Sequence, residues 1–146
     1  MALHRLFPRL SALPHRLTSR SSAAYNCFAW AAGIDDCWWE PDPLGDNYWP
    51  SNAPCERTLE AIVETYGTIG FGVCETSDLN PDFEKIAIYS KDGEATHAAR
   101  QLPNGSWTSK LGPLEDIEHT LEGLEGAEYG VVARFLRRSR EKLPLV

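Results

Sequence analysis

The chain has 146 residues, 42% of them hydrophobic and 24% charged, with a formal net charge of −7. This size and composition fit one soluble globular domain over residues 1–146. The acidic balance argues against a nucleic-acid-binding protein, and no stretch reaches the ~18 consecutive apolar residues of a membrane-spanning helix. We therefore expect no nucleic-acid partner and no membrane association, and a cytoplasmic location because no secretory signal is recognisable.

The first 22 residues differ in charge from the rest of the chain. They contain four arginines and no acid, whereas residues 23–146 hold all 21 acidic side chains. We expect residues 1–22 to form an irregular basic segment that packs on the acidic body, with a cleaved targeting segment as the alternative. At the other end of the chain, residues 138–146 are expected to form a flexible tail.

The first predicted element is a short helix over residues 26–33. Asn26 is a good N-cap, the interior is rich in alanine, and Gly33 is a natural end. A long segment dense in Trp, Pro, Asp and Asn follows at residues 35–54, and it cannot be regular structure. Its aromatic rings are too apolar to lie in water, so this aromatic loop is expected to be functional or to fold over the domain.

The remaining chain is predicted to form a helix and then strands, with a second helix inserted. Helical spacing of apolar residues predicts helices over residues 57–66 and 114–124. Strands are predicted at residues 85–89, 96–102, 106–111 and 129–136, with a short edge strand at 70–74. The predicted fold class is α+β, with helices first and then an antiparallel meander.

The cysteines and histidines do not show the spacing of a metal site. Four cysteines stand far apart at positions 27, 37, 55 and 74, without the paired pattern that binds zinc. In a cytoplasm we expect these thiols to be reduced. A metal site built from His97, Asp116 and His119 has no recognisable spacing, so neither a metal nor another cofactor is predicted. His119 is expected either to support a neighbouring site or to lie at the surface.

Cys27 is the candidate nucleophile. At the start of a helix, unpaired N–H groups and the helix dipole lower the pKa of a thiol. Such a thiol also needs a base, ordinarily a histidine on another element. His97 is the best candidate because its neighbours Thr96, Ala98 and Ala99 are small. The alternative is that Cys27 is a packed core thiol and His97 a core histidine.

The sequence Tyr25-Asn26-Cys27, which opens an Ala-rich helix and is followed by a histidine on a strand, resembles the cell-wall peptidases and amidases of the NlpC class. This resemblance implies a papain-like fold, in which an N-terminal helix carrying the cysteine packs on a small antiparallel sheet. It also implies a third polar residue that orients the imidazole. Ser109 occupies that place, and Asp116 is the alternative. Asn26 departs from the class, which has an acid before the cysteine.

The chain as a whole resembles a bacterial domain family of unknown function, over roughly residues 6–137. This resemblance implies family membership but brings no established activity. The motifs that carry it are YNCFAWA at 25–31, WW at 38–39, YWP at 48–50, KIAIY at 85–89, THAARQ at 96–101, WTSKLG at 107–112 and DIEH at 116–119.

The predicted function is a thiol hydrolase that cleaves an amide or ester bond. His97 would take the proton of Cys27, and the Cys27 backbone N–H, helped by the Asn26 side chain, would receive the oxyanion. The aromatic residues Trp38, Trp39 and Trp49 would wall the cleft, which suits a peptide or sugar-peptide substrate. Alternatively, these rings pack together as a small core of their own.

Two other functions remain open at this point. In the first, the domain is a non-catalytic protein-binding module on the same fold, with an inert Cys27 and a protein partner at the aromatic loop. In the second, Cys27 and Cys37 act as a redox pair, which requires their Cα atoms to lie within ~7 Å of each other.

Overall fold

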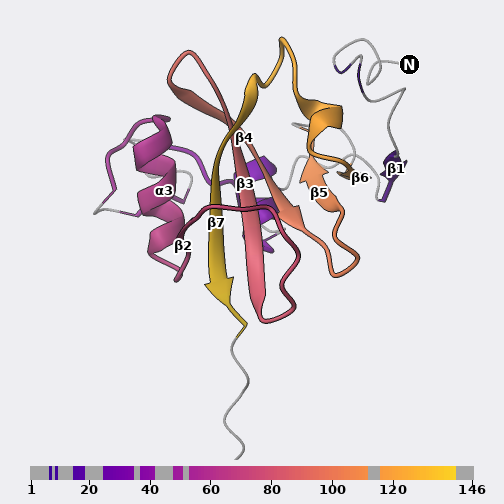
Figure 1. Cartoon of the computed structure of the whole chain (residues 1–146). Helices are drawn as coiled ribbons and strands as arrows, with labels where there is room; N and C mark the ends of the chain where they lie inside the picture. Colours follow the sequence, from indigo (N-terminus) through magenta and orange to yellow (C-terminus); the bar gives the residue numbers. More distant parts are fainter. Residues whose placement is uncertain are drawn as a thin grey trace, which may run out of the picture.

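The computed structural model describes residues 7, 9, 15–18, 25–34, 37–41, 48–50, 53–111 and 116–140. These residues form one seven-stranded antiparallel sheet, in the order β1-β6-β5-β4-β3-β7-β2, and two short α-helices (Figure 1). The elements are β1 His15–Leu17, α2 Cys27–Ala31, α3 Leu59–Gly67, β2 Gly72–Cys74, β3 Phe83–Lys91, β4 Glu94–Gln101, β5 Trp107–Lys110, β6 Asp116–His119, the 3-10 turn η2 Glu122–Leu124 and β7 Val131–Ser139.

The predicted α+β, papain-like fold is wrong, because the sheet dominates the structure and the helices are short. The helix predicted over residues 114–124 accounts for part of this difference. Asp116–His119 is instead strand β6, which pairs with β5 on one side and β1 on the other. Apolar residues three or four apart predicted a helix there, but the hydrogen bonds offered by two neighbouring strands outweigh that local preference.

Both ends of the chain also differ from the prediction. The basic start was expected to be irregular, yet residues 15–17 form strand β1, which pairs with β6. The expected contact with the acidic body is present in the ion pair of Arg16 with Glu118, at 2.6 Å. The expected tail begins too early, because β7 continues through Ser139. Residues 141–146 lie outside the described residues.

Most other predicted elements are confirmed. Helix α3 lies where helical spacing placed it, and the Thr58 side chain caps it by accepting from the Ala61 N–H at 3.3 Å. Strands β2, β3, β4, β5 and β7 lie within two residues or so of the predicted starts. Each of these elements has a strong local pattern or a Gly-containing turn at its end.

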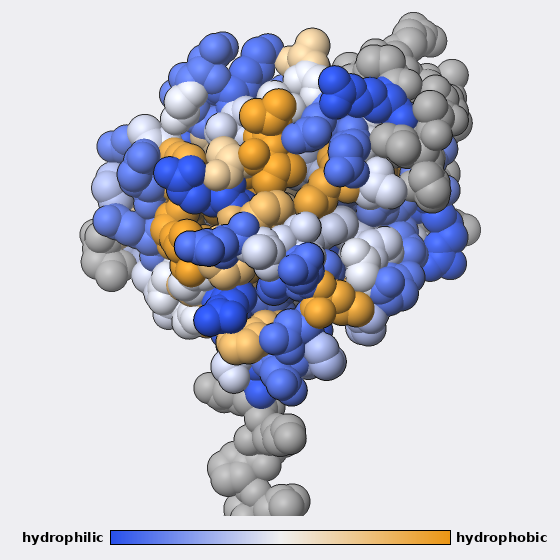
Figure 2. Space-filling model, in the orientation of Figure 1, coloured by the Kyte–Doolittle hydropathy of each residue, from blue (hydrophilic) through white to orange (hydrophobic). Residues whose placement is uncertain are grey.

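The two faces of the sheet carry different cores. Side chains alternate between the faces along a strand. Ile86, Ile88 and Ala98 pack with α2 and α3, whereas Tyr89 and Ala99 pack on the opposite face. Figure 1 shows α2 behind the central strands and α3 beside β2 and β7. On the face that looks away from α2, hydrophobic side chains gather over the middle of the sheet (Figure 2).

The described residues show neither a membrane span nor a disulfide. No helix among them is long and apolar enough to cross a membrane. No disulfide joins the four cysteines, all of which lie in the described part of the chain. Within these same ranges, no group of three or more His, Cys, Asp or Glu side chains is placed to hold a metal ion.

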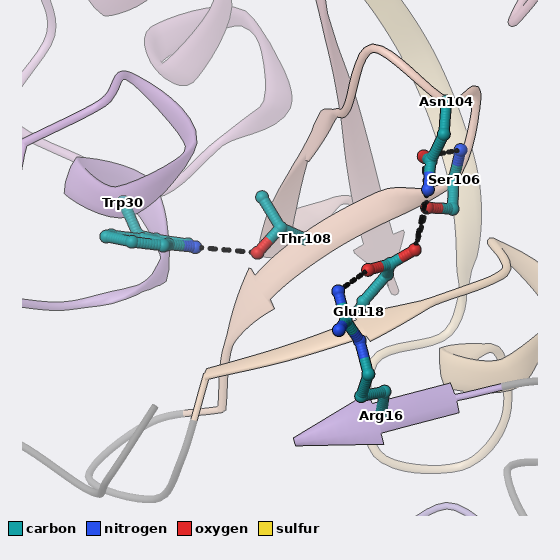
Figure 3. A network of polar contacts seen from close by, with 6 residues as sticks. All are labelled: Arg16, Trp30, Asn104, Ser106, Thr108 and Glu118. Atoms are coloured by element: carbon teal, nitrogen blue, oxygen red, sulfur yellow. Dashed lines mark hydrogen bonds and ion pairs between the residues drawn. The ribbon is translucent and has the colours of Figure 1, made fainter. Parts of the chain in front are cut away.

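Glu118 on β6 ties strand β1 and the turn before β5 to its own strand at the surface (Figure 3). Its carboxylate accepts from Ser106 Oγ at 2.6 Å, from Asn104 Nδ2 at 3.0 Å and from Arg16 at 2.6 Å. These three hydrogen bonds lower the Glu118 pKa from 4.5 to about 2, and the bond from Ser106 has the largest effect. A carboxylate with a depressed folded pKa stabilises the fold above its unfolded pKa.

We therefore expect the wild type to lose this contribution as pH falls from about 4.5 to about 2. Glu118→Gln should lose less stability than the wild type across that window, because it has no carboxylate to protonate. Thermal unfolding followed by circular dichroism at several pH values measures the difference. Glu75→Gln, at an exposed position, is the matched control, and parallel curves for Glu118→Gln and wild type would contradict the prediction.

Candidate active site

Asn26 fixes the start of helix α2 and the aromatic loop together. Its Oδ1 accepts from the backbone N–H groups of Ala29 at 3.1 Å and Trp39 at 3.0 Å. Its Nδ2 donates to the Trp39 carbonyl at 2.8 Å and to Glu40 Oε2 at 3.4 Å. The predicted N-cap is confirmed. Because both amide hydrogens already have acceptors, the Asn26 side chain would have to leave them in order to bind an oxyanion.

Cys27 is the first residue of α2 and is half-buried against the core under the helix. Burial raises the pKa of its thiol to about 11, although a backbone hydrogen bond from Ala98 and the nearby Arg57 guanidinium lower it in part. The position of Cys27 at the start of a helix predicted a lowered pKa. That expectation is reversed because α2 has only five residues, and desolvation of the sulfur outweighs its dipole. Near neutral pH, Cys27 is therefore a protonated thiol.

His97 lies on the opposite face of β4 from α2. It is fully buried and pairs across the strands with Tyr89. Its Nε2 lies 2.9 Å from Ser109 Oγ, and Ser109 Oγ lies 2.6 Å from Nε2 of His119. His119 in turn places Nδ1 2.7 Å from the Thr120 carbonyl oxygen. Two imidazoles and one hydroxyl thus form a continuous buried chain.

The directions of these hydrogen bonds follow from the carbonyl at one end. The Thr120 carbonyl can only accept, so His119 Nδ1 carries a hydrogen. Burial lowers the His119 pKa to about 4, and in the neutral ring Nε2 is then an acceptor. Ser109 donates its hydroxyl hydrogen to that nitrogen and accepts from His97 Nε2–H. The remaining nitrogen of His97, Nδ1, is left with a lone pair and no hydrogen.

That nitrogen has no hydrogen-bond partner among the described residues, although it is buried. Burial, and to a smaller extent the neighbouring His119, hold the pKa of His97 well below its usual range. The Tyr129 ring stacks on the imidazole at 4.2 Å between centroids. The next residue, Gly130, lies close to β3, where a Cβ would be 2.0 Å from the Ser90 carbonyl oxygen. An unpartnered buried nitrogen is costly and therefore calls for a functional explanation.

The thiol meets strand β4 close to this histidine. Strands β4 and β5 pair at Arg100 and Gln101 but not further along β4 toward His97. In this open stretch, the Cys27 sulfur interacts with the backbone of Ala98, the residue after His97. No hydrogen bond joins Cys27 to either nitrogen of His97. The structure therefore brings the thiol and the imidazole to adjacent positions on the two sides of the β4 backbone.

Asp116 belongs to the other face of the sheet. It is buried and accepts from the Tyr25 hydroxyl at 2.5 Å. Lys110, its partner across β5 and β6, is also buried, with Nζ 5.4 Å from the centre of the Tyr25 ring. Of the two candidates for orienting His97, Ser109 contacts the imidazole, whereas Asp116 orients Tyr25.

The aromatic loop packs on the domain through Trp39. This ring is 2% exposed and contacts Tyr48 at 4.8 Å and Tyr66 at 5.7 Å between centroids. Trp38 and Trp49 are half-buried, and the Trp49 indole donates to the Pro54 carbonyl at 2.8 Å. Little of the Trp39 ring is left for a substrate, while Trp38 and Trp49 each keep some exposed surface. Residues 42–47 of this loop lie outside the described residues.

Three residues near the site escaped the sequence argument. Arg57 and Glu40 form an ion pair with each other. Arg57 lowers the Cys27 pKa and Glu40 raises it. Tyr129 stacks on His97, and its own pKa is raised by burial and further by the nearby Cys27. No motif marks Arg57 or Glu40. The sequence offered one signal for Tyr129, which lies between two glycines, Gly126 and Gly130. In the structure, these glycines exchange two backbone hydrogen bonds.

Comparison with known proteins identifies a family but no activity. A family described as a domain of unknown function, DUF7689, matches residues 16–137. No curated protein and no solved structure shows a significant match to the chain. The family membership expected from the motifs is therefore confirmed. The chain belongs to the DUF7689 family, whose matched region contains Cys27, His97, Ser109 and His119.

Proposed function

We propose that this domain is a thiol hydrolase, in which Cys27 attacks the carbonyl carbon of an amide or ester and His97 acts as its general base. The observation that carries the proposal is the unpartnered Nδ1 of His97. It is a buried basic nitrogen and its other ring nitrogen is held by Ser109, while the Cys27 thiol contacts the backbone of Ala98 on the other side of β4. Nucleophilic catalysis needs such an imidazole in hydrogen-bond contact with the thiol, so the proposal requires that the two groups meet when a substrate binds.

The resting pair is neutral, which defines the order of proton transfer. Both the raised pKa of Cys27 and the lowered pKa of His97 oppose a stable thiolate–imidazolium pair. His97 Nδ1 would therefore take the proton while the sulfur bonds to the carbonyl carbon. The leaving amine or alcohol takes that proton as the tetrahedral intermediate collapses to a thioester. Water then hydrolyses the thioester, with His97 as base again, and restores the thiol.

Two features support this assignment of roles. The chain from His97 through Ser109 and His119 to the Thr120 carbonyl holds the hydrogen of His97 on Nε2 and leaves the Nδ1 lone pair to take a proton. Arg57, which lowers the Cys27 pKa, favours negative charge on the sulfur. For transfer to occur, the Cys27 thiol and the His97 imidazole, which lie on the two sides of the β4 backbone, must first come into hydrogen-bond contact, which requires a local rearrangement when a substrate binds. A peptide or sugar-peptide remains the proposed substrate class.

A non-catalytic protein-binding module is the second candidate. The raised pKa of Cys27 favours it, because a thiol with a pKa of about 11 is a poor nucleophile when nothing assists it. In this case a protein partner would contact the exposed parts of the aromatic loop. Tyr48, which is 40% exposed, is one such surface.

Acylation by p-nitrophenyl acetate at pH 7.5, resolved for each cysteine by peptide mass spectrometry, separates the two functions. Cys55 is exposed and serves as an internal reference. A pKa of about 11 for Cys27 leaves roughly 300-fold less thiolate than an ordinary thiol of pKa about 8.5. Without a general base, Cys27 should thus react far more slowly than Cys55. With His97 as its base, Cys27 should react faster than Cys55 and release acetate.

His97→Gln should slow acylation of Cys27 by roughly 100-fold or more and leave Cys55 unchanged. His15→Gln, on strand β1, is the matched control and should behave as wild type. Slow Cys27 acylation that does not respond to His97→Gln would reject the hydrolase and favour the binding module.

A further inference from the structure

A groove of about 250 Å³ lies between helix α3 and the last strand of the sheet, β2, which Figure 1 shows beside the helix. It is lined by Leu59, Glu60, Val63, Glu64, Val73 and Arg134. Its volume is below the ~300–1,000 Å³ that is typical of pockets for a small molecule. Such a groove suits individual side chains of a longer ligand.

Helix α3 forms one wall of this groove and presents an apolar row and an acidic row. Leu59 and Val63 lie one turn apart and are half-buried against the core. Glu60 and Glu64 also lie one turn apart, and both are exposed. Neither carboxylate takes part in the ion pairs formed by the described residues. The helix therefore places two negative charges beside an apolar surface.

Strand β2 forms the other wall and lies at the edge of the sheet. It pairs with β7 on one side and with no other strand in the described part of the chain. In an antiparallel pair, backbone groups point alternately toward the partner strand and away from it, so β2 keeps N–H and C=O groups that face outward. Its side chain at the groove, Val73, is 60% exposed. The strand has no charged residue and no proline, which are features that commonly block an edge.

The charges of the groove favour a basic ligand. Arg134 is the cation among the described lining residues, and its guanidinium donates to the Ala133 carbonyl at 2.8 Å. Two carboxylates and one guanidinium leave one negative charge here, on a chain whose formal net charge is −7. A second copy of this chain, paired through β2, would bring Glu60 and Glu64 of both copies toward the same edge. Like charges therefore disfavour a second copy as the occupant.

We propose that this groove binds an extended peptide of a partner protein, which adds a strand to β2 and carries an apolar and a basic side chain two residues apart. Side chains at this spacing point to the same face of a strand. The apolar one would lie between α3 and Val73, and the basic one would reach Glu60 and Glu64. Main-chain hydrogen bonds at a sheet edge give such a complex its affinity, and pockets for alternate side chains give it specificity. The inference does not depend on the proposed hydrolase activity, because neither Cys27 nor His97 lines the groove.

Fluorescence anisotropy of labelled synthetic peptides, titrated with the full chain at low salt and pH 7.5, tests the site. The probe Thr-Val-Thr-Lys-Thr-Val-Thr places its valines and its lysine on one face of a strand. The control Thr-Val-Lys-Thr-Thr-Val-Thr has the same composition but places the lysine on the other face. The probe should bind saturably. The control, and a probe with Glu in place of Lys, should each bind roughly tenfold or more weakly.

Val73→Lys should weaken binding of the probe by roughly tenfold or more, because it removes apolar surface and repels the basic side chain. Leu79→Lys is the matched control, since Leu79 is 48% exposed and does not line the groove. Replacing both Glu60 and Glu64 by Gln should abolish the preference for the Lys probe over the Glu probe. These three positions are exposed, so the variants should fold.

Three results would overturn the proposal. The first is the absence of saturable binding of the probe, and the second is equal binding of the probe and its composition-matched control. The third is equal binding of the probe by Val73→Lys and Leu79→Lys. Analytical ultracentrifugation of the chain without peptide adds a further test. Self-association that Val73→Lys abolishes would assign the edge to a second copy and reject the partner peptide, whereas a monomer that binds the probe supports it.

Discussion

Asn26→Asp is expected to destabilise the domain by about 3–5 kcal/mol at pH 7, although it changes one amide nitrogen to oxygen. The Asn26 side chain is 4% exposed. Its Nδ2 faces two acceptors, the Trp39 carbonyl and the Glu40 carboxylate. An aspartate would bring a buried negative charge against both, with no hydrogen to donate. The two hydrogen bonds that Oδ1 accepts from backbone N–H groups would survive but could not offset this repulsion.

The penalty should depend on pH with a definite sign. The introduced carboxyl has a raised pKa in the folded state, so its cost is largest at neutral pH and shrinks as pH falls toward the unfolded value of about 3.9. Urea unfolding at pH 7 and pH 5 measures both values. Asn104→Asp is the matched control, because Asn104 also donates to a glutamate carboxylate, at 3.0 Å, but is exposed. A cost equal to that of the control, or one independent of pH, would show that Asn26 does not hold these contacts.

This prediction gives a physical reason for one departure from the NlpC-class pattern. That class has an acid before the cysteine, where this chain has Asn26. In the structure, the side chain must both donate and accept in order to hold Trp39 against α2. An amide offers two N–H donors and an acceptor oxygen without carrying charge. The difference from the class is therefore linked to the packed aromatic loop.

The elements that could be predicted are those determined by their own residues. Helix α3 has a Thr cap and one apolar face, and β3 to β5 are apolar runs bounded by Gly-containing turns. Strands β1 and β6 could not be found in this way. Each is three or four residues long and exists because it completes the hydrogen bonds of a neighbour. The mistaken helix over residues 114–124 contributed to the wrong fold class, because it replaced strand β6, and the irregular start predicted for the chain left out β1.

The candidate site shows a similar division. The residue types Cys27, His97 and Ser109 could be picked from the sequence, and the structure places Ser109 against His97. The ionisation of Cys27 could not be predicted, because it depends on how deeply the sulfur is buried rather than on its position in α2. The role of His119 also depends on the fold. Only the pairing of β5 with β6 places it behind Ser109.

Ser109→Ala is expected to destabilise the domain by about 2–4 kcal/mol and to release the proton of His97 from Nε2. Ser109 is fully buried between the two imidazoles. Removing its hydroxyl leaves a donor on His97 and an acceptor on His119 without partners, and each buried unsatisfied group costs about 1–3 kcal/mol. Urea unfolding measures the stability, and ¹⁵N spectra of the imidazoles show which nitrogen of His97 carries the proton.

Ser139→Ala makes the same chemical change at an exposed position and should alter stability by less than about 0.5 kcal/mol. A double variant with His119→Phe separates the two lost contacts. Once Ser109 is gone, replacing His119 removes the stranded acceptor, so the second substitution should cost less than it does in the wild type. If the two costs simply add, or if Ser109→Ala leaves the His97 proton on Nε2, the hydroxyl does not couple the imidazoles. The lone pair on His97 Nδ1, on which the proposed chemistry rests, would then need another cause.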